Sequence, residues 1–156
     1  MDNWVKVRWG FREDEARVAE LLELNGMPRW AAFEERYIVA EERGEVLAAL
    51  SYRTASKQLF LGLLLADPWG SERRLAEALY AGALDLAWEA GIGEVRARAL
   101  RDDYPGEVGY RRWRGGWYAD TTLPFEVWSE LPASGGRRVL SLLGIAAVPF
   151  FRAFRS

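Results

Sequence analysis

The sequence predicts a mixed α/β fold built on a single sheet with parallel and antiparallel strand pairs. The first observation is the stretch 59–91, in which an apolar run, a tight turn and an amphipathic helix follow one another. The second is that three shorter strand patterns precede this stretch as a meander and a further alternating pattern follows it. A strand, a helix and another strand in this order form a parallel pair, so the sheet must be mixed.

Residues 59–65 form an apolar run that is too short for a stable helix and ends at the turn sequence Asp67-Pro68-Trp69-Gly70. This pattern predicts a strand buried on both faces. Ser71 is a suitable N-cap for the following helix, and Gly91 favours a left-handed cap at its end. The expected apolar face is Leu75, Leu79, Ala83 and Leu86, and the expected polar face is Arg73, Glu77, Asp85 and Glu89. Unpaired N–H groups at such a helix start attract phosphate.

The remaining elements are predicted from local patterns. A helix at 13–24 follows a strand at 5–9, and a short helical turn at 29–35 follows the helix. Further strands are expected at 37–40, 46–52 and 94–100, with polar turns at 41–45 and 54–57 and an aromatic-rich strand or hairpin that begins at Tyr110 and includes Trp113, Trp117 and Tyr118. The expected apolar side of the helix at 13–24 is Ala16, Val18, Ala19, Leu21 and Leu22.

Composition excludes several classes of function. The 156 residues suffice for one domain with a hydrophobic core, and the net charge of −2 gives no reason to expect nucleic acid as a partner. The chain has no cysteine and no histidine, which excludes disulfides, thiolate or histidine metal sites and Ser-His-Asp hydrolases. Proton transfer must therefore use carboxylates, tyrosines, lysines or water. Without a secretory pattern or a membrane-spanning apolar run, we predict a cytoplasmic protein that needs no metal ion.

The strand, the proline after it, the tight loop and the long Ala/Leu helix resemble the coenzyme-binding core of the GNAT family of N-acetyltransferases. The resemblance covers about residues 4–120 and implies a GNAT-like acyl-CoA N-acyltransferase fold. In that family a loop of the form Arg/Gln-x-x-Gly-x-Gly/Ala binds the pyrophosphate of acetyl-CoA. The corresponding positions here are Ser71, Arg74 and Ala76, of which only Ala76 keeps the family pattern. The coenzyme-binding residues implied in this loop are Ser71, Arg73, Arg74, Leu75 and Ala76, with charge supplied by the two arginines.

The resemblance also implies groups for acetyl transfer. Backbone amides of the central strand would bind the coenzyme, one of them close to the thioester oxygen, and they belong to Leu63, Leu64 and Leu65. The candidates for a general base that acts through a bound water are Glu34, Glu35 and Glu41. A solvated surface position is the other interpretation of these carboxylates. The aromatic residues Trp30, Trp113 and Trp117 either line an acceptor pocket or pack in the core and hairpin.

The family's Tyr-x-x-x-Gly-Phe/Tyr pattern matches Gly109-Tyr110 at its end and Tyr104 after a shift of one residue. The resemblance implies that Tyr104 is the general acid for the departing thiolate. The alternative is a loop aromatic that precedes Pro105.

Residues 131–156 lie beyond the predicted domain, which we place at 1–130. This extension carries four arginines and no acidic residue, and 133–136 has the composition of a flexible linker. The apolar stretch 139–151 is too short to span a bilayer and contains Pro149. We therefore expect it to be covered by the protein's own surface or a homodimer, to contact a membrane peripherally through 137–156, or to be disordered. In the membrane case the headgroups would be bound by Arg137, Arg138, Arg152 and Arg155.

Three functional hypotheses follow. The first is an N-acetyltransferase that moves an acetyl group from acetyl-CoA to a small-molecule or peptide amine. The second is a catalytically silent domain of the same fold that binds acyl-CoA for regulation. The third is a membrane-associated structural module that depends on the C-terminal extension.

Overall fold

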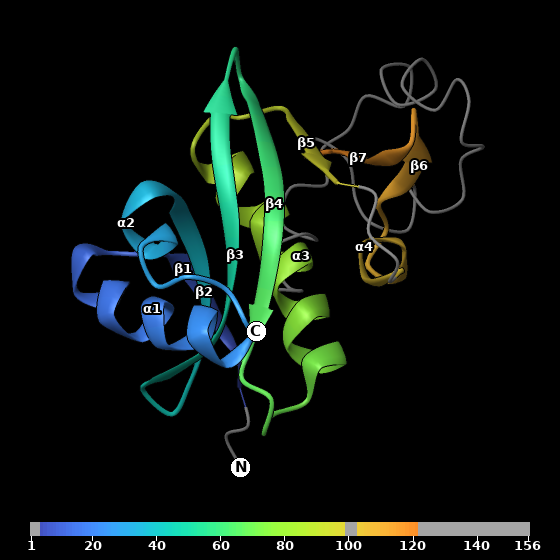
Figure 1. Ribbon diagram of the computed structural model, residues 1–156. Coiled ribbons are helices and arrows are strands. Elements are labelled where there is room, and N and C mark those ends of the chain that lie inside the picture. Colours follow the sequence, from blue (N-terminus) through green and yellow to red (C-terminus); the bar gives the residue numbers. More distant parts are fainter. Residues whose placement is uncertain (1–3, 99–102, 122–156) are drawn as a thin grey trace, which may run out of the picture.

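The structure is a computed structural model that describes residues 4–98 and 103–121 (Figure 1). These residues form one seven-stranded mixed sheet in the order β1-β2-β3-β4-β5-β7-β6, which confirms the predicted fold class. The elements in chain order are β1 (Lys6–Trp9), the 3₁₀ helix η1 (Arg12–Asp14), α1 (Glu15–Leu24), α2 (Ala31–Glu34), β2 (Arg36–Glu42), β3 (Glu45–Ala55), β4 (Gln58–Ala66), α3 (Glu72–Glu89), β5 (Glu94–Ala97), α4 (Tyr104–Glu107), β6 (Arg111–Trp113) and β7 (Gly116–Asp120).

The strand connections agree with the predicted order. Strands β1 to β4 form an antiparallel meander, β4 and β5 pair in parallel through α3, and the β6–β7 hairpin joins β5 through β7. The turn between β2 and β3 consists of Arg43 and Gly44 at φ values of 54° and 81°, the backbone that a two-residue type I′ hairpin requires. Strand β3 extends beyond its predicted end, so the turn to β4 contains only Ser56 and Lys57.

Helices cover both faces of the sheet. Helix α3 packs across β1 to β5 and against α4, whereas α1 lies on the opposite face over β3 and β4 and contacts α2 (Figure 1). The four predicted core positions of α3 are all buried: Leu75, Leu79, Ala83 and Leu86. Gly82 allows α3 to approach β1, because a Cβ at this position would lie 2.5 Å from the Cβ of Val7. A second core beneath α1 contains Leu21, Leu22, Val39 and Leu65.

Several burial predictions are wrong. Asp85, expected on the polar face of α3, is fully buried because the segment 80–87 is enclosed on all sides. Ala16, expected on the apolar side of α1, is exposed, and the predicted helix start at residue 13 lies in η1. Strand β4 is not buried on both faces: Phe60 and residues 62–64 are half-buried, and Phe60, Gly62 and Leu63 line a cavity.

The predicted boundary at residue 130 and the extension 131–156 lie outside the described residues, as do the last two residues of the strand expected at 94–100. Within the described part of the chain, no helix combines the length and the apolar character needed to cross a bilayer.

Candidate functional site

A bulge in β4 lies at the centre of the site. Leu50 and Tyr52 of β3 pair with Leu64 and Leu61, so two residues of β4 oppose Ser51 alone. The Leu63 N–H donates to Ser51 Oγ at 2.7 Å. A Cβ at residue 62 would lie 2.6 Å from the same oxygen, so the bulge requires the glycine found there. The buried Ser51 hydroxyl thus holds the bulge in place.

Beyond the bulge, β4 continues without β5. Their pairing covers Gln58–Leu61, and the Arg98 N–H donates to the Leu61 carbonyl at 3.3 Å. Within residues 4–98 and 103–121, no later residue of β4 pairs with β5. Among the described residues, this edge of β4 beyond Leu61 has no strand partner, so it can bind a ligand.

Alternation along β4 determines which amides face that open edge. The Leu63 N–H and, farther along, the Asp67 N–H both donate toward β3, the latter to Leu47 at 2.8 Å. Because successive residues direct their N–H groups to opposite sides, Leu65 also faces β3 and Leu64 faces the open edge. Of the three leucines predicted to bind the coenzyme, Leu64 therefore offers its amide in the expected direction.

Helix α1 fixes the loop that follows β4. The Asp67 carboxylate accepts from the Trp69 N–H at 2.9 Å and from Arg17 at 2.7 Å. The Trp69 amide, and after it Arg17, hold the pKa of Asp67 below its ordinary value. Asn25, at the end of α1, donates to the Ala66 carbonyl at 3.0 Å. The loop is therefore positioned by Arg17 of α1 and by its own carboxylate, and Asn25 after α1 holds the end of β4.

The start of α3 has the predicted cap. The Arg74 N–H donates to Ser71 Oγ at 3.4 Å, and the Leu75 N–H donates to the Ser71 carbonyl at 3.0 Å. The amides of Glu72 and Arg73 precede the first helical acceptor and so have no partner within the helix. They point out of the helix start, where the dipole favours an anion.

Side chains of the first turn divide into two groups. Those of Leu75 and Ala76 are fully buried, so these predicted ligands can contribute only backbone. The two arginines are exposed and each contacts a carboxylate: Arg73 approaches Glu77 at 3.4 Å and Arg74 binds Glu42 at 2.7 Å. The Arg73–Glu77 pair is open to solvent and therefore weak, so the Arg73 guanidinium can turn to a phosphate. The Arg74 guanidinium is half exposed but is held by Glu42, whose side chain is largely buried.

Tyr104 lies beside the same helix start. Its hydroxyl donates to Glu72 Oε2 at 2.7 Å, and the Arg73 guanidinium lies 5.3 Å from the centre of its ring. The side chain is largely buried in α4 against α3. The structure thus groups this predicted acid with the loop arginines and not with the predicted bases.

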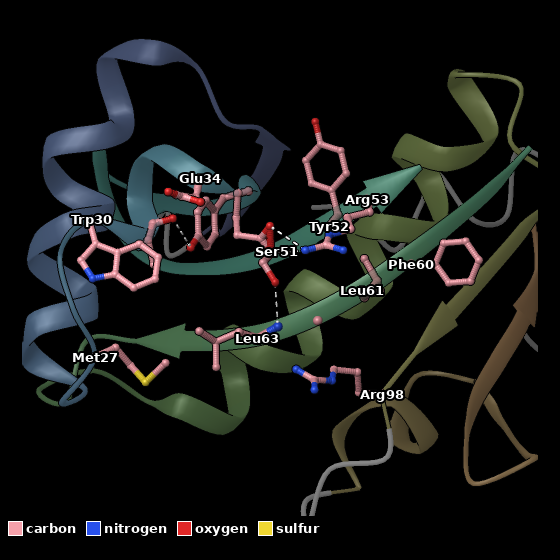
Figure 2. A pocket seen from close by; sticks show the side chains of 14 residues that line it. Met27, Trp30, Glu34, Ser51, Tyr52, Arg53, Phe60, Leu61, Leu63 and Arg98 are labelled. Atoms are coloured by element: carbon pink, nitrogen blue, oxygen red, sulfur yellow. Dashed lines mark hydrogen bonds and ion pairs between the residues drawn. The ribbon is translucent and has the colours of Figure 1, made fainter. Parts of the chain in front are cut away.

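A cavity of about 590 Å³ lies on the other side of the bulge, between the α1–α2 connection, β3 and β4 (Figure 2). It is lined by four residues that the sequence singled out: Trp30, Glu34, Glu35 and Leu63. The other lining residues are Met27, Ala31, Tyr37, Ser51, Tyr52, Arg53, Phe60, Leu61, Gly62 and Arg98. We call this cavity the acceptor pocket, after the acceptor pocket that the sequence predicts around Trp30; its lining extends to Arg98, which follows β5.

Charged groups of the acceptor pocket are arranged unevenly. Glu35 accepts from Arg53 at 3.2 Å, and the Tyr37 hydroxyl donates to the Ala31 carbonyl at 3.1 Å. Burial, and then the negative charge of Glu35, raises the pKa of Tyr37, so this phenol stays protonated at neutral pH. The Glu35 carboxylate and the Tyr37 phenol thus lie in the lining of the same pocket, with Glu35 also bound to Arg53.

The other sequence candidates lie elsewhere. Glu41 is bound by Arg8 at 2.9 Å, outside the acceptor pocket. The rings of Trp113 and Tyr118 pack together 5.3 Å apart in the β6–β7 hairpin, and Trp117 is buried. The described ranges contain no cluster of three or more Asp and Glu side chains that could hold a metal ion.

Sequence reasoning missed Ser51, Gly62 and Arg98. The glycine was the available signal, because a glycine inside a strand pattern often marks a bulge. Ser51 becomes recognisable only through its cross-strand register with β4. Arg98 depends on where β5 ends relative to the acceptor pocket, which local sequence does not determine.

Neither a family model nor a curated protein sequence matches the chain. Solved structures do match it. A GNAT family acetyltransferase from Brucella melitensis in complex with acetyl-CoA is 15% identical, with a TM-score of 0.58, and the match covers 76% of this chain and 88% of that one. The ribosomal-protein-S18-alanine N-acetyltransferase from Escherichia coli is 14% identical, with a TM-score of 0.59, and the match covers 74% of this chain and 90% of that one. A GNAT family N-acetyltransferase from Escherichia coli in complex with CoA is 16% identical, with a TM-score of 0.58, and the match covers 78% of this chain and 83% of that one.

The mixed sheet, with helices on both faces and a central strand that leaves its parallel neighbour, defines the class of α/β fold to which the chain belongs. More specifically, the chain has the fold of the GNAT N-acetyltransferases, as the sequence resemblance implied.

Proposed function

We propose that the protein is an acetyl-CoA-dependent N-acetyltransferase. The observation that carries this proposal is the β4 bulge at Gly62 and Leu63, which lies between an open strand edge and a pocket lined by carboxylates. The edge leads to a capped helix start with free amides and two arginines. A thioester on one side of the bulge and an amine on the other would meet at β4. Two structures of the same fold are complexes with acetyl-CoA and CoA, which supports this choice of coenzyme.

The residues present fit a pyrophosphate at the start of α3. The amides of Glu72 and Arg73 would donate to it, and the guanidinium groups of Arg73 and Arg74 would neutralise it. Glu72 is an unfavourable charge at this position, and its carboxylate already accepts a hydrogen bond from Tyr104. Ser71 would act through its cap, and Leu75 and Ala76 through their backbone. The Leu64 amide would bind along the open edge.

Acetyl-CoA would supply the acetyl thioester, and the chain would supply three further contributions. Glu34 and Glu35 would accept the proton of the acceptor amine through a water in the acceptor pocket. The Leu64 N–H would donate to the carbonyl oxygen as the new C–N bond forms and the C–S bond breaks. Tyr104 is the predicted proton donor to the sulfur, but its hydroxyl lies on Glu72 beside the proposed pyrophosphate site, so water is the other candidate for this proton.

Coenzyme binding and turnover test the proposal together. We expect acetyl-CoA to raise the melting temperature and to release heat in a titration, because a ligand of the folded state stabilises it. Release of CoA should follow with at least one member of a panel of amines, amino acids, peptides and polyamines. Glu35→Gln should lower kcat, whereas Glu41→Gln, outside the acceptor pocket, should not. Binding without turnover would point to a silent acyl-CoA-binding domain, and no binding at millimolar acetyl-CoA would refute both functions.

We also propose that residues 1–130 form the folded domain and that 131–156 control association. Deletion of residues 134–156 should leave the domain folded and change its association state or its binding to membranes. Light scattering and flotation with anionic liposomes, on full-length and truncated protein, measure the two effects. A monomer in both forms that floats in neither would contradict the homodimer and membrane hypotheses.

A further inference from the structure

One carboxylate and one guanidinium of the acceptor pocket have no partner among the residues that the structure describes. Among the described residues, Glu34 and Arg98 form no ion pair and no side-chain hydrogen bond, whereas the other two charged side chains of the pocket, Glu35 and Arg53, bind each other at 3.2 Å. Figure 2 shows Glu34 and Arg98 at opposite ends of the pocket, with the Ser51–Leu63 hydrogen bond between them in this view. The pocket therefore has a negative end and a positive end.

The position of Arg98 is set by the sheet. In β5, Val95 and Ala97 are buried on the α3 face, so alternation directs Arg98 to the opposite face, where the acceptor pocket lies. Its backbone N–H is bonded to the Leu61 carbonyl, one residue before the bulge. The guanidinium thus belongs to the wall nearest the point where β4 and β5 separate.

An acceptor with only one kind of charge would use half of this pocket. A simple amine is attracted by Glu34 and Glu35 but leaves Arg98 unused, and an acceptor with only negative charge is repelled by both carboxylates. A molecule with an ammonium group and a carboxylate matches both ends, and a guanidinium binds a carboxylate through two parallel hydrogen bonds. The apolar side chains of Met27, Trp30 and Phe60 in the lining of the pocket suit an apolar substituent.

We propose that the acceptor is a zwitterionic amine, bound with its amino group toward Glu34 and Glu35 and its carboxylate on Arg98. The proposal rests on the acetyltransferase function above and narrows its substrate class. A free amino acid and a short peptide with a carboxylate near its amino terminus share this chemistry. Acetylation of the amino group would remove the ammonium charge that Glu34 attracts, which favours release of the product.

Matched acceptors test the charge requirement. Phenylalanine, phenylalaninamide and phenethylamine present the same ring and amine with the carboxylate present, neutralised or absent. A peptide that begins Phe-Asp tests whether the acceptor can be a peptide with a carboxylate near its amino terminus. We expect kcat/KM from CoA release to be about tenfold to a hundredfold higher for phenylalanine or the peptide than for phenethylamine, the effect of one charge-assisted contact. Arg98→Met should abolish this preference and leave the KM for acetyl-CoA unchanged.

Arg112→Met is the matched control. The strand register places Arg112 beside Trp117 and hence on the opposite face of the sheet, so the preference should persist in this variant. An equal loss with all three phenyl acceptors in Arg98→Met, or a raised KM for acetyl-CoA, would overturn the proposal.

If no amine is turned over, the acetyltransferase function fails, and calorimetry of phenylalanine against phenethylamine still tests the pocket. Equal heats of binding for the two ligands, or heats that Arg98→Met leaves unchanged, would refute the proposal that the pocket binds a zwitterionic amine.

Discussion

A double-mutant cycle can measure how strongly the Ser51 hydroxyl holds the β4 bulge. Ser51→Ala removes the buried acceptor of the partly buried Leu63 N–H, and a donor left unsatisfied in this way costs about 1–3 kcal/mol. Gly62→Ala places a Cβ 2.6 Å from the same oxygen, so the hydroxyl must turn away and the hydrogen bond is lost again. Each single variant should therefore lower the free energy of unfolding by about 1–3 kcal/mol.

The double variant should be little worse than either single one. Once Oγ is absent, the nearest atoms to the new Cβ at residue 62 are the Ser51 carbonyl oxygen at 3.8 Å and the Ser51 Cβ at 4.0 Å, ordinary van der Waals distances. All three variants then lack the same hydrogen bond and none retains a clash. The coupling free energy between Ser51→Ala and Gly62→Ala should therefore be about as large as the effect of one single variant, about 1–3 kcal/mol.

Urea unfolding gives the free energies, and CoA release gives kcat for the same proteins. We expect kcat to fall up to about a hundredfold in each variant, because a shift of the bulge moves the neighbouring Leu64 amide. Thr54→Ala, an exposed position on the same strand, is the control and should change neither quantity. Additive free energies would show that the hydroxyl does not hold the bulge and would refute the reasoning.

Three further outcomes are expected. The double substitution Arg73→Ala and Arg74→Ala should weaken acetyl-CoA binding by about tenfold or more with little change in melting temperature, since both side chains are exposed; unchanged affinity in calorimetry would contradict it. Tyr104→Phe should lower kcat about a hundredfold at nearly constant coenzyme affinity, and unchanged turnover would leave Tyr104 a packing residue. The depressed pKa values of Asp14 and Asp67 contribute stability that is present above about pH 4 and is lost as the pH falls through the pKa values of the folded state. Asp67→Asn should therefore make the free energy of unfolding depend less on pH in the acid range. An unchanged pH dependence would exclude this contribution.

Local sequence patterns predicted the helices and strands of the fold because each pattern depends on residues close to one another in the sequence. The apolar run of β4, the Ser71 cap and the glycine after α3 involve neighbours within a few residues, and all three are confirmed. Asp85 shows where local patterns fail. Its place in the helical repeat resembles that of a solvated position, and only the packing around α3 buries it.

The site was harder to predict because its members come from separate elements. Glu34, Glu35 and Glu41 are similar in sequence context, yet only the first two line the acceptor pocket, and Glu41 is bound by Arg8. That distinction depends on the register of β2 with β1 and on the path of the α1–α2 connection. Ser51 was missed for the same reason, because its role exists only opposite the bulge.

Helix α1 contacts both halves of the site. Arg17 and Asn25 hold the loop after β4, and the chain that leaves α1 supplies Met27 and Trp30 to the acceptor pocket. A ligand that fixes the helix at one end lowers the entropy that must be lost at the other. Thermodynamic linkage then requires each substrate to raise the affinity for the other by the same factor, so the two should bind with positive cooperativity although no residue need touch both.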